Sequence, residues 1–160
     1  MLAKVTGVSM TAKLTKLNQV YHYTECGLKN IWLNGVYLDA DGDPVIPNLN
    51  HLHQEIAKEL ALQKKRLSGN EIRFLRTHIG LSAADFAKKI LKVAPETVSR
   101  WEHDKQVMDS STELLLRMLT LKKVHFTDYE LDDLADFDGH KKIRLEARFS
   151  AKSNRWNLAA

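Results

Sequence analysis

The sequence predicts a mainly α protein with a small antiparallel β-sheet near the N-terminus and a short β segment near the C-terminus. Through most of residues 48–123, apolar residues recur three and four positions apart, which is the spacing of one face of a helix. Residues 20–38 are instead rich in β-branched and aromatic side chains, and after Gly139 apolar and polar residues alternate. Both of these patterns are typical of strands.

The composition is that of a folded, soluble chain. Of the 160 residues, 44% are hydrophobic and 28% are charged, which excludes a disordered protein. The net charge of +4 permits binding to nucleic acid without requiring it. Cys26 is the single cysteine, so we expect no disulfide framework and a reducing compartment. Because no apolar run has membrane-spanning or signal-peptide length, we expect a cytoplasmic protein with no membrane partner.

Residues 20–47 are expected to form two or three antiparallel strands. Asn34-Gly35 lies between two runs of strand-forming residues and is a strong signal for a tight hairpin turn. A helix is then predicted over residues 48–67. Its apolar face would consist of Leu49, Leu52, Ile56 and Leu60.

Two helices are predicted between positions 70 and 91. The first turns Ile72 and Leu75 inward and ends at Gly80, where glycine permits a positive φ. Ser82 then caps the second helix, because its hydroxyl can accept from backbone N–H groups near Asp85. The buried side of the second helix is expected to contain Phe86, Ala87 and Ile90.

A third helix is predicted to begin at Pro95, where the missing backbone N–H costs nothing. Val98 and Trp101 would point to the core. The residues left on the outer side are Pro95, Glu96, Thr97, Ser99 and Arg100. Such a helix suits the major groove of DNA, where arginine can bond guanine at two atoms and hydroxyls reach phosphates or base edges. The alternative from spacing alone is a solvated helix in a bundle.

Residues 80–87, GLSAADFA, and residues 93–102, VAPETVSRWE, resemble the lambda-repressor-like (Xre) family of helix-turn-helix regulators. The resemblance implies a sequence-specific DNA-binding transcriptional regulator whose third helix reads bases. One departure is Leu91-Lys92-Val93, which stands where the family has leucine-glycine-valine and leaves one extra residue after Ala87. The second helix is therefore expected to be longer, or the turn wider.

The resemblance also implies roles for residues around the third helix. Bases would face Pro95, Glu96, Thr97, Ser99 and Arg100. Ser82 and Ala83, at the start of the second helix, would offer backbone N–H groups to a phosphate. Lys105, in the loop after the third helix, would contact a second phosphate. Arg76 and Glu102 would form a structural salt bridge.

A wider resemblance involves residues 21–28, YHYTECGL, and residues 31–35, IWLNG. These are similar to regulators related to the DNA-binding half of MqsA-type antitoxins. Those antitoxins carry a paired-cysteine zinc module, which cannot be carried over because this chain has no CxxC. The alternative function implied is an antitoxin-type protein. It would bind a toxin through its N-terminal sheet or C-terminal tail and autoregulate its operon.

Four segments are expected along the chain. They are a flexible N-terminus (1–18), a small sheet plus a helix (19–67), the helix-turn-helix DNA-binding domain (68–124), and an acidic linker with a basic strand-like tail (125–160). The last division rests on charge, since residues 125–139 carry −6 and residues 140–160 carry +5.

Double-stranded DNA and a second copy of the chain are the expected partners, because one helix-turn-helix contacts few base pairs. The tail would carry apolar residues along one side of a strand that needs a partner. These residues are Ile143, Leu145, Phe149 and Trp156. The partner is either another subunit or the chain's own sheet at 20–47.

No pattern supports catalysis. His22 near Cys26, and His51 near His53, are possible metal or Cys–His pairs, but HExxH is absent and helical residues two apart point in different directions. The acidic residues within 128–138 lack the spacing of a calcium loop. We therefore expect no enzyme activity, no metal and no cofactor.

Overall fold

The computed structural model describes residues 13–139 and 144–159. The chain divides into two compact units. The sheet unit comprises Met1–Ile56 with Ile143–Ala160, and the helical unit comprises Ala57–Lys142. In sequence, the helical unit is therefore an insertion between strands of the sheet unit.

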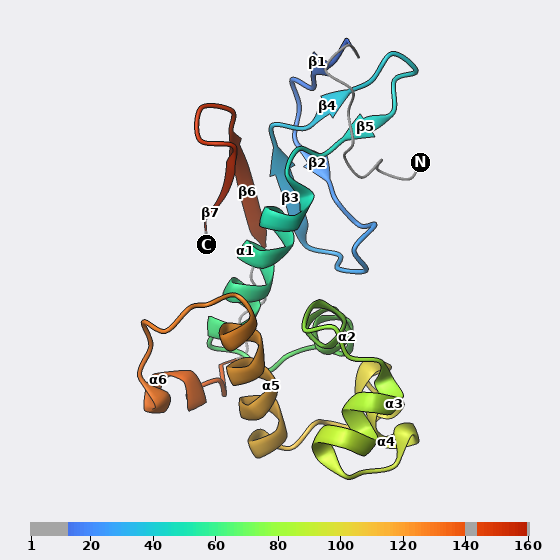
Figure 1. Ribbon diagram of the computed structural model, residues 1–160, viewed down its shortest axis with the longest axis vertical. Coiled ribbons are helices and arrows are strands. Elements are labelled where there is room, and N and C mark those ends of the chain that lie inside the picture. Colours follow the sequence, from blue (N-terminus) through green and yellow to red (C-terminus); the bar gives the residue numbers. More distant parts are fainter. Residues whose placement is uncertain (1–12, 140–143, 160) are drawn as a thin grey trace. The chain divides into compact units, whose positions relative to one another are not determined.

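Among the described residues, the sheet unit contains two sheets (Figure 1). The first is antiparallel in the order β1-β4-β5, with β1 (Thr15–Lys16), β4 (Tyr37–Leu38) and β5 (Pro44–Val45). The second has the order β2-β3-β6-β7, with β2 (Tyr21–His22), β3 (Ile31–Asn34), β6 (Leu145–Ser150) and β7 (Arg155–Ala159). Strands β3 and β6 are parallel, and their neighbours are antiparallel.

The expectation of a mainly α protein was wrong. Of the described residues, 42% lie in helices and 17% in strands, and the fold is a mixed α/β fold. The pairing of β3 with β6 joins the C-terminal β segment to the N-terminal sheet, which is one of the two partners expected for the tail. Ile31 pairs with Leu145 and Leu33 with Ala147, and all four are buried. Alternation of apolar residues identifies a strand, but it does not identify a partner that is distant along the chain.

The two ends of the sheet unit bear on other expectations. The segment 1–18 was expected to be flexible, and its residues 1–12 lie outside the described residues. Within the rest of that segment, the strand β1 pairs with β4. Ile143, expected to begin the C-terminal strand, also lies outside the described residues.

Asn34-Gly35 does not close a hairpin, contrary to expectation. The strands on either side, β3 and β4, belong to different sheets. Gly35 has a φ of +110°, and a Cβ added there would lie 2.7 Å from the Cβ of Phe149. The glycine therefore turns the chain from one sheet into the other at a point where β6 passes too closely for a side chain.

The C-terminal strands pack against their own chain. Trp156 of β7 is buried, its backbone N–H donates to Nδ1 of His51 (3.2 Å), and its indole N–H donates to the carbonyl oxygen of Pro47 (2.7 Å). His51 belongs to helix α1 (Leu49–Leu62), whose predicted apolar face is buried. The apolar side of the tail thus has a partner within the chain, which removes the reason for expecting a dimer interface there.

The described part of the helical unit begins within α1 and continues through five α-helices and one π-helix (Figure 1). These are α2 (Gly69–His78), α3 (Ala83–Asp85), η1 (Phe86–Leu91), α4 (Pro95–Glu102), α5 (Ser110–Lys123) and α6 (Leu131–Ala135). The expected cap by Ser82 on the Asp85 N–H and the expected start at Pro95 are confirmed. In the described part of the chain, no helix is both long and apolar enough to cross a membrane.

The extra residue after Ala87 is accommodated by η1. In a π-helix the backbone bonds join residues five apart, so one more residue fits in a turn. The N–H of Lys92 donates to the carbonyl of Ala87, and Lys92 ends the helix with a φ of 57°. The expectation that Ile90 is buried was wrong, since Ile90 is 41% exposed. The wider winding turns it away from the core that holds Phe86.

The acidic segment 125–139, expected to be a linker, packs within the helical unit. Leu134 of α6 is buried in a cluster with Ala61 and Leu121, and Phe137 is also buried. The Gly139 N–H donates to the carbonyl oxygen of Lys64 (2.9 Å), which joins the backbone of the segment to the chain just after α1. Phe126 and Tyr129 also pack against this cluster, so apolar side chains hold a segment whose charges face solvent.

Sequence reasoning missed a buried ion pair within α5, between Arg117 and Glu113, whose arginine also bonds the chain at the end of α1. The guanidinium of Arg117 donates to the carbonyl oxygens of Ala61, Gln63 and Lys65 at 3.0, 2.7 and 2.6 Å. It also donates to the carboxylate of Glu113 at 2.8 Å. Carbonyl groups near the end of α1, which lack helical partners, are thereby satisfied by one side chain.

Candidate nucleic-acid interface

Helix α4 is held by its inner side and by the start of α2. Val98 and Trp101 are buried. Gly69 lies so close to the end of α4 that an added Cβ would be 2.4 Å from the carbonyl oxygen of Glu102. Asp104, just after α4, accepts from the Gly69 N–H at 2.8 Å. These contacts anchor α4 on α2 and leave its other side to solvent.

The solvent side of α4 carries the residues expected to contact DNA. Glu96, Ser99 and Arg100 are exposed, and Pro95 and Thr97 are half-buried. Within residues 13–139 and 144–159, no acidic side chain forms an ion pair with Arg100. The N–H donors of this guanidinium can therefore bond to a guanine edge or a phosphate.

Glu102 points away from this surface. It is buried, and its carboxylate accepts from Arg76 and Arg73, with Oε2 lying 3.2 Å from Nη2 of Arg76 and 3.1 Å from Nε of Arg73. The Nε of Arg76 contacts the other oxygen. The expected Arg76–Glu102 salt bridge is confirmed. Glu102 therefore joins α4 to α2, and its carboxylate does not face the solvent side of the helix.

Two residues beside this surface were missed by sequence reasoning. Nδ1 of His103 donates to the carbonyl oxygen of Ser99 at 2.7 Å, and Nε2 lies 3.4 Å from Nη2 of Arg73. Arg73 belongs to α2, so its approach depends on how α2 packs against α4. The sequence carries no signal for that juxtaposition, because helical spacing does not relate residues of separate helices.

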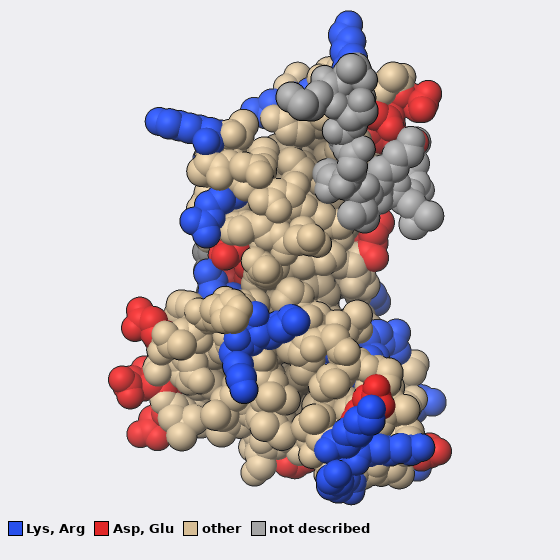
Figure 2. All heavy atoms as spheres, in the orientation of Figure 1, with Lys and Arg blue, Asp and Glu red and all other residues tan. Residues whose placement is uncertain are grey.

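Lysines of the preceding helix and turn add positive charge. Lys88, Lys89 and Lys92 are exposed. Lys89 forms an exposed ion pair with Asp85 at 3.1 Å, which offsets its charge. On the face seen in Figure 2, Lys and Arg side chains gather over the part of the helical unit that holds α3 and α4. Charge of this sign attracts phosphate at long range.

The remaining predicted contacts lie at helix ends. Ser82 is exposed, and Ala83, the first residue of α3, is half-buried. Backbone N–H groups in a first helical turn have no intrahelical partner, although here the Ser82 hydroxyl takes that of Asp85. Lys105 is exposed in the loop after α4, and its backbone N–H donates to the carbonyl of Arg100 at 2.9 Å.

The other residues considered for chemistry have structural partners. His22 stacks on Trp32 with ring centroids 4.0 Å apart. Burial raises the pKa of the Cys26 thiol, which disfavours the thiolate that a nucleophile needs. His51 and His53 bond to Trp156 and to Tyr23. Among the residues that the structure describes, no three His, Cys, Asp or Glu side chains are grouped to hold a metal ion.

Comparisons with protein-family models, with curated proteins and with solved structures found no match to this chain. The function is therefore inferred from the geometry and charge of the site.

Proposed function

We propose that this chain is a sequence-specific DNA-binding protein that regulates transcription, with α4 lying in the major groove. The observation that carries the proposal is that α4 has one buried side and one exposed, polar side. Val98, Trp101 and Glu102 are buried on one side, and Arg100 stands without an ion-pair partner among the described residues on the other. A helix of this length fits the major groove, where an arginine can recognise guanine.

Each exposed group has a complementary part of the duplex. Arg100 would donate to guanine, Glu96 can accept from a cytosine amino group, and the hydroxyls of Thr97 and Ser99 can reach either bases or phosphates. Pro95 would contribute an apolar contact. Ser82 and Ala83 at the start of α3, and Lys105 after α4, would contact the backbone on either side.

Selection of bound duplexes from a random pool, with purified full-length protein alone, tests the proposal. A reproducible enriched motif is expected. The matched control is a triple variant, Thr97→Ala with Ser99→Ala and Arg100→Ala, whose selected pool should show no motif. An unenriched pool from the wild-type protein would contradict the proposal, as would the same motif from the triple variant.

Arg100→Ala is expected to weaken binding to the selected site by about 1–3 kcal/mol and to relax preference at one base pair. The reason is the loss of two donors to one guanine. Competition binding of single-base variants of the site measures both effects. Arg148→Ala, at an exposed arginine in β6, is the control and should change neither. Equal loss on specific and random DNA would show that Arg100 contacts only phosphate.

Lys105→Ala is expected to weaken binding to all sequences alike. Because a phosphate contact releases one counterion, the slope of log affinity against log salt should fall by about one. Binding isotherms at several salt concentrations measure this slope. Lys152→Ala, at an exposed lysine after β6, should leave the slope unchanged. A changed base preference in Lys105→Ala would contradict the assignment.

We also propose that two copies bind one operator. A single reading helix contacts few base pairs, so footprinting should protect two half-sites about 34 Å apart, or a multiple of that distance, related by a two-fold axis. Light scattering of the complex should give two chains per duplex. One chain protecting one half-site would contradict this expectation. Deletion of 140–160 is not a suitable test, because it removes β6 and β7 from the sheet.

A further inference from the structure

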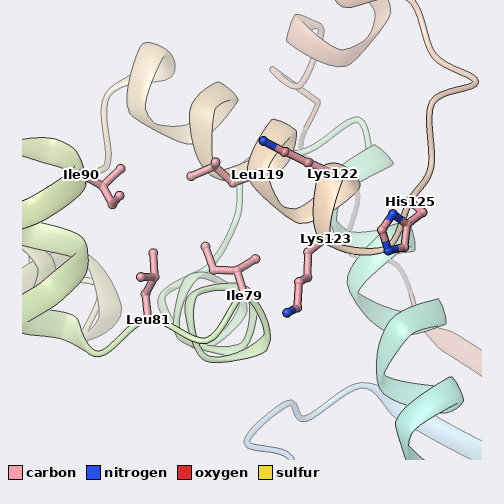
Figure 3. A pocket seen from close by; sticks show the side chains of 7 residues that line it. All are labelled: Ile79, Leu81, Ile90, Leu119, Lys122, Lys123 and His125. Carbon is pink, nitrogen blue, oxygen red and sulfur yellow. The ribbon is translucent and has the colours of Figure 1, made fainter.

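A groove lies on the helical unit between the end of α2, η1 and α5 (Figure 3). Its volume is about 390 Å³. Sites for small organic molecules have volumes of roughly 300–1,000 Å³. The groove is therefore large enough to receive such a molecule, and it lies apart from the outer side of α4 described above.

One part of the groove is aliphatic. Its apolar lining consists of Ile79, Leu81, Ile90 and Leu119, and in Figure 3 these side chains face a common space. Ile90 is 41% exposed because the π-helical winding of η1 turns it out of the core. The exposed part of this aliphatic side chain is apolar surface that a bound molecule could cover.

The other part of the groove is basic. It is lined by Lys122, Lys123 and His125, at the end of α5. In Figure 3 the ammonium group of Lys123 extends toward Ile79 and that of Lys122 toward Leu119. No carboxylate is among the described lining residues, so the charge at this end is positive and faces the aliphatic side chains.

We propose that this groove binds a small organic anion with an aliphatic body, of the medium-chain carboxylate class. A neutral apolar molecule would make no use of the two exposed ammonium groups. An inorganic anion would leave four aliphatic side chains uncovered. A carboxylate on an aliphatic chain satisfies both parts, because charge-assisted hydrogen bonds form at one end and apolar area is buried at the other. This site is independent of the proposed DNA contacts.

Titration of uniformly ¹⁵N-labelled full-length protein with sodium decanoate, below its micelle-forming concentration, tests the proposal. Saturable amide shift changes are expected at the lining residues of α2, η1 and α5. Decanol and inorganic phosphate are the matched probes, and each should bind at least about tenfold more weakly, since each lacks one of the two interactions. Equal affinity for decanol, or shift changes centred elsewhere, would overturn the proposal.

Variants separate the two parts of the site. Lys122→Gln with Lys123→Gln should weaken decanoate binding about tenfold or more and leave decanol binding unchanged. Ile90→Gln, at an exposed position, should weaken binding of both probes. Lys152→Gln, in the sheet unit, is the control and should weaken neither. If instead the groove amides broaden with protein concentration and ignore decanoate, a second copy covers the groove and the proposal is wrong.

Discussion

Glu113→Leu is expected to lower the free energy of unfolding by about 3–5 kcal/mol. The substitution removes the carboxylate that bonds the buried guanidinium of Arg117, and the two side chains are 0% and 2% exposed in the native protein. Burial already lowers the pKa of Arg117, which reflects the cost of holding the charged form there. Glu113 also accepts from the backbone N–H of Leu67 at 2.9 Å, and this bond is lost as well. Urea unfolding followed by circular dichroism measures the change.

Two controls accompany the Glu113 variant. Glu130→Leu, at an exposed acidic residue, should change stability by less than about 0.5 kcal/mol. The double variant Glu113→Leu with Arg117→Met removes both charges, and it should be more stable than Glu113→Leu alone, because an isolated buried charge costs more than an absent pair. A double variant less stable than the single one would show that the carbonyl bonds of Arg117, and not its charge, dominate.

Arg76→Met is the second substitution expected to have a large effect, also about 3–5 kcal/mol. It removes the more buried of the two arginines on Glu102, and it releases a bond of 2.7 Å to the carbonyl of Leu81. Glu102 is 4% exposed, Arg76 is 12% exposed and Arg73 is 48% exposed. Loss of Arg76 therefore leaves the carboxylate with Arg73 as its one side-chain partner among the described residues, and Arg73 is partly solvated.

Arg73→Met provides the matched control for Arg76→Met. Both arginines bond the same carboxylate, but an exposed pair contributes only about 0–1 kcal/mol. The stability difference between the two variants thus isolates the effect of burial. Equal decreases in the free energy of unfolding would show that Arg73 and Arg76 stabilise α4 to the same extent, and that the burial of Arg76 has no effect.

Much of the candidate site could be predicted from the sequence, because its elements are specified locally. Ser82 caps the helix that follows it, Pro95 begins α4, and the spacing of Val98 and Trp101 assigns the buried side of that helix. Once one side is buried, the other is exposed. The approach of Arg73 to this surface could not be predicted, since it depends on the packing of α2 against α4. His103 lies four residues after Ser99, so helical spacing could have placed it there.

The sequence by itself located the helices that the structure has at 49–62, 69–78 and 95–102, since caps, a leading proline and apolar periodicity act within a few residues of the chain. The predicted end of the first helix at residue 67 was wrong, because α1 ends at Leu62. Only the tertiary structure decided the parallel pairing of β3 with β6, for which the free energy comes from burying apolar residues far apart in sequence. It also decided the exposure of Ile90, because one extra residue is absorbed as π-helical winding between fixed ends. The role of Arg117 was decided in the same way, because the carbonyl groups it satisfies belong to a segment that only folding brings near.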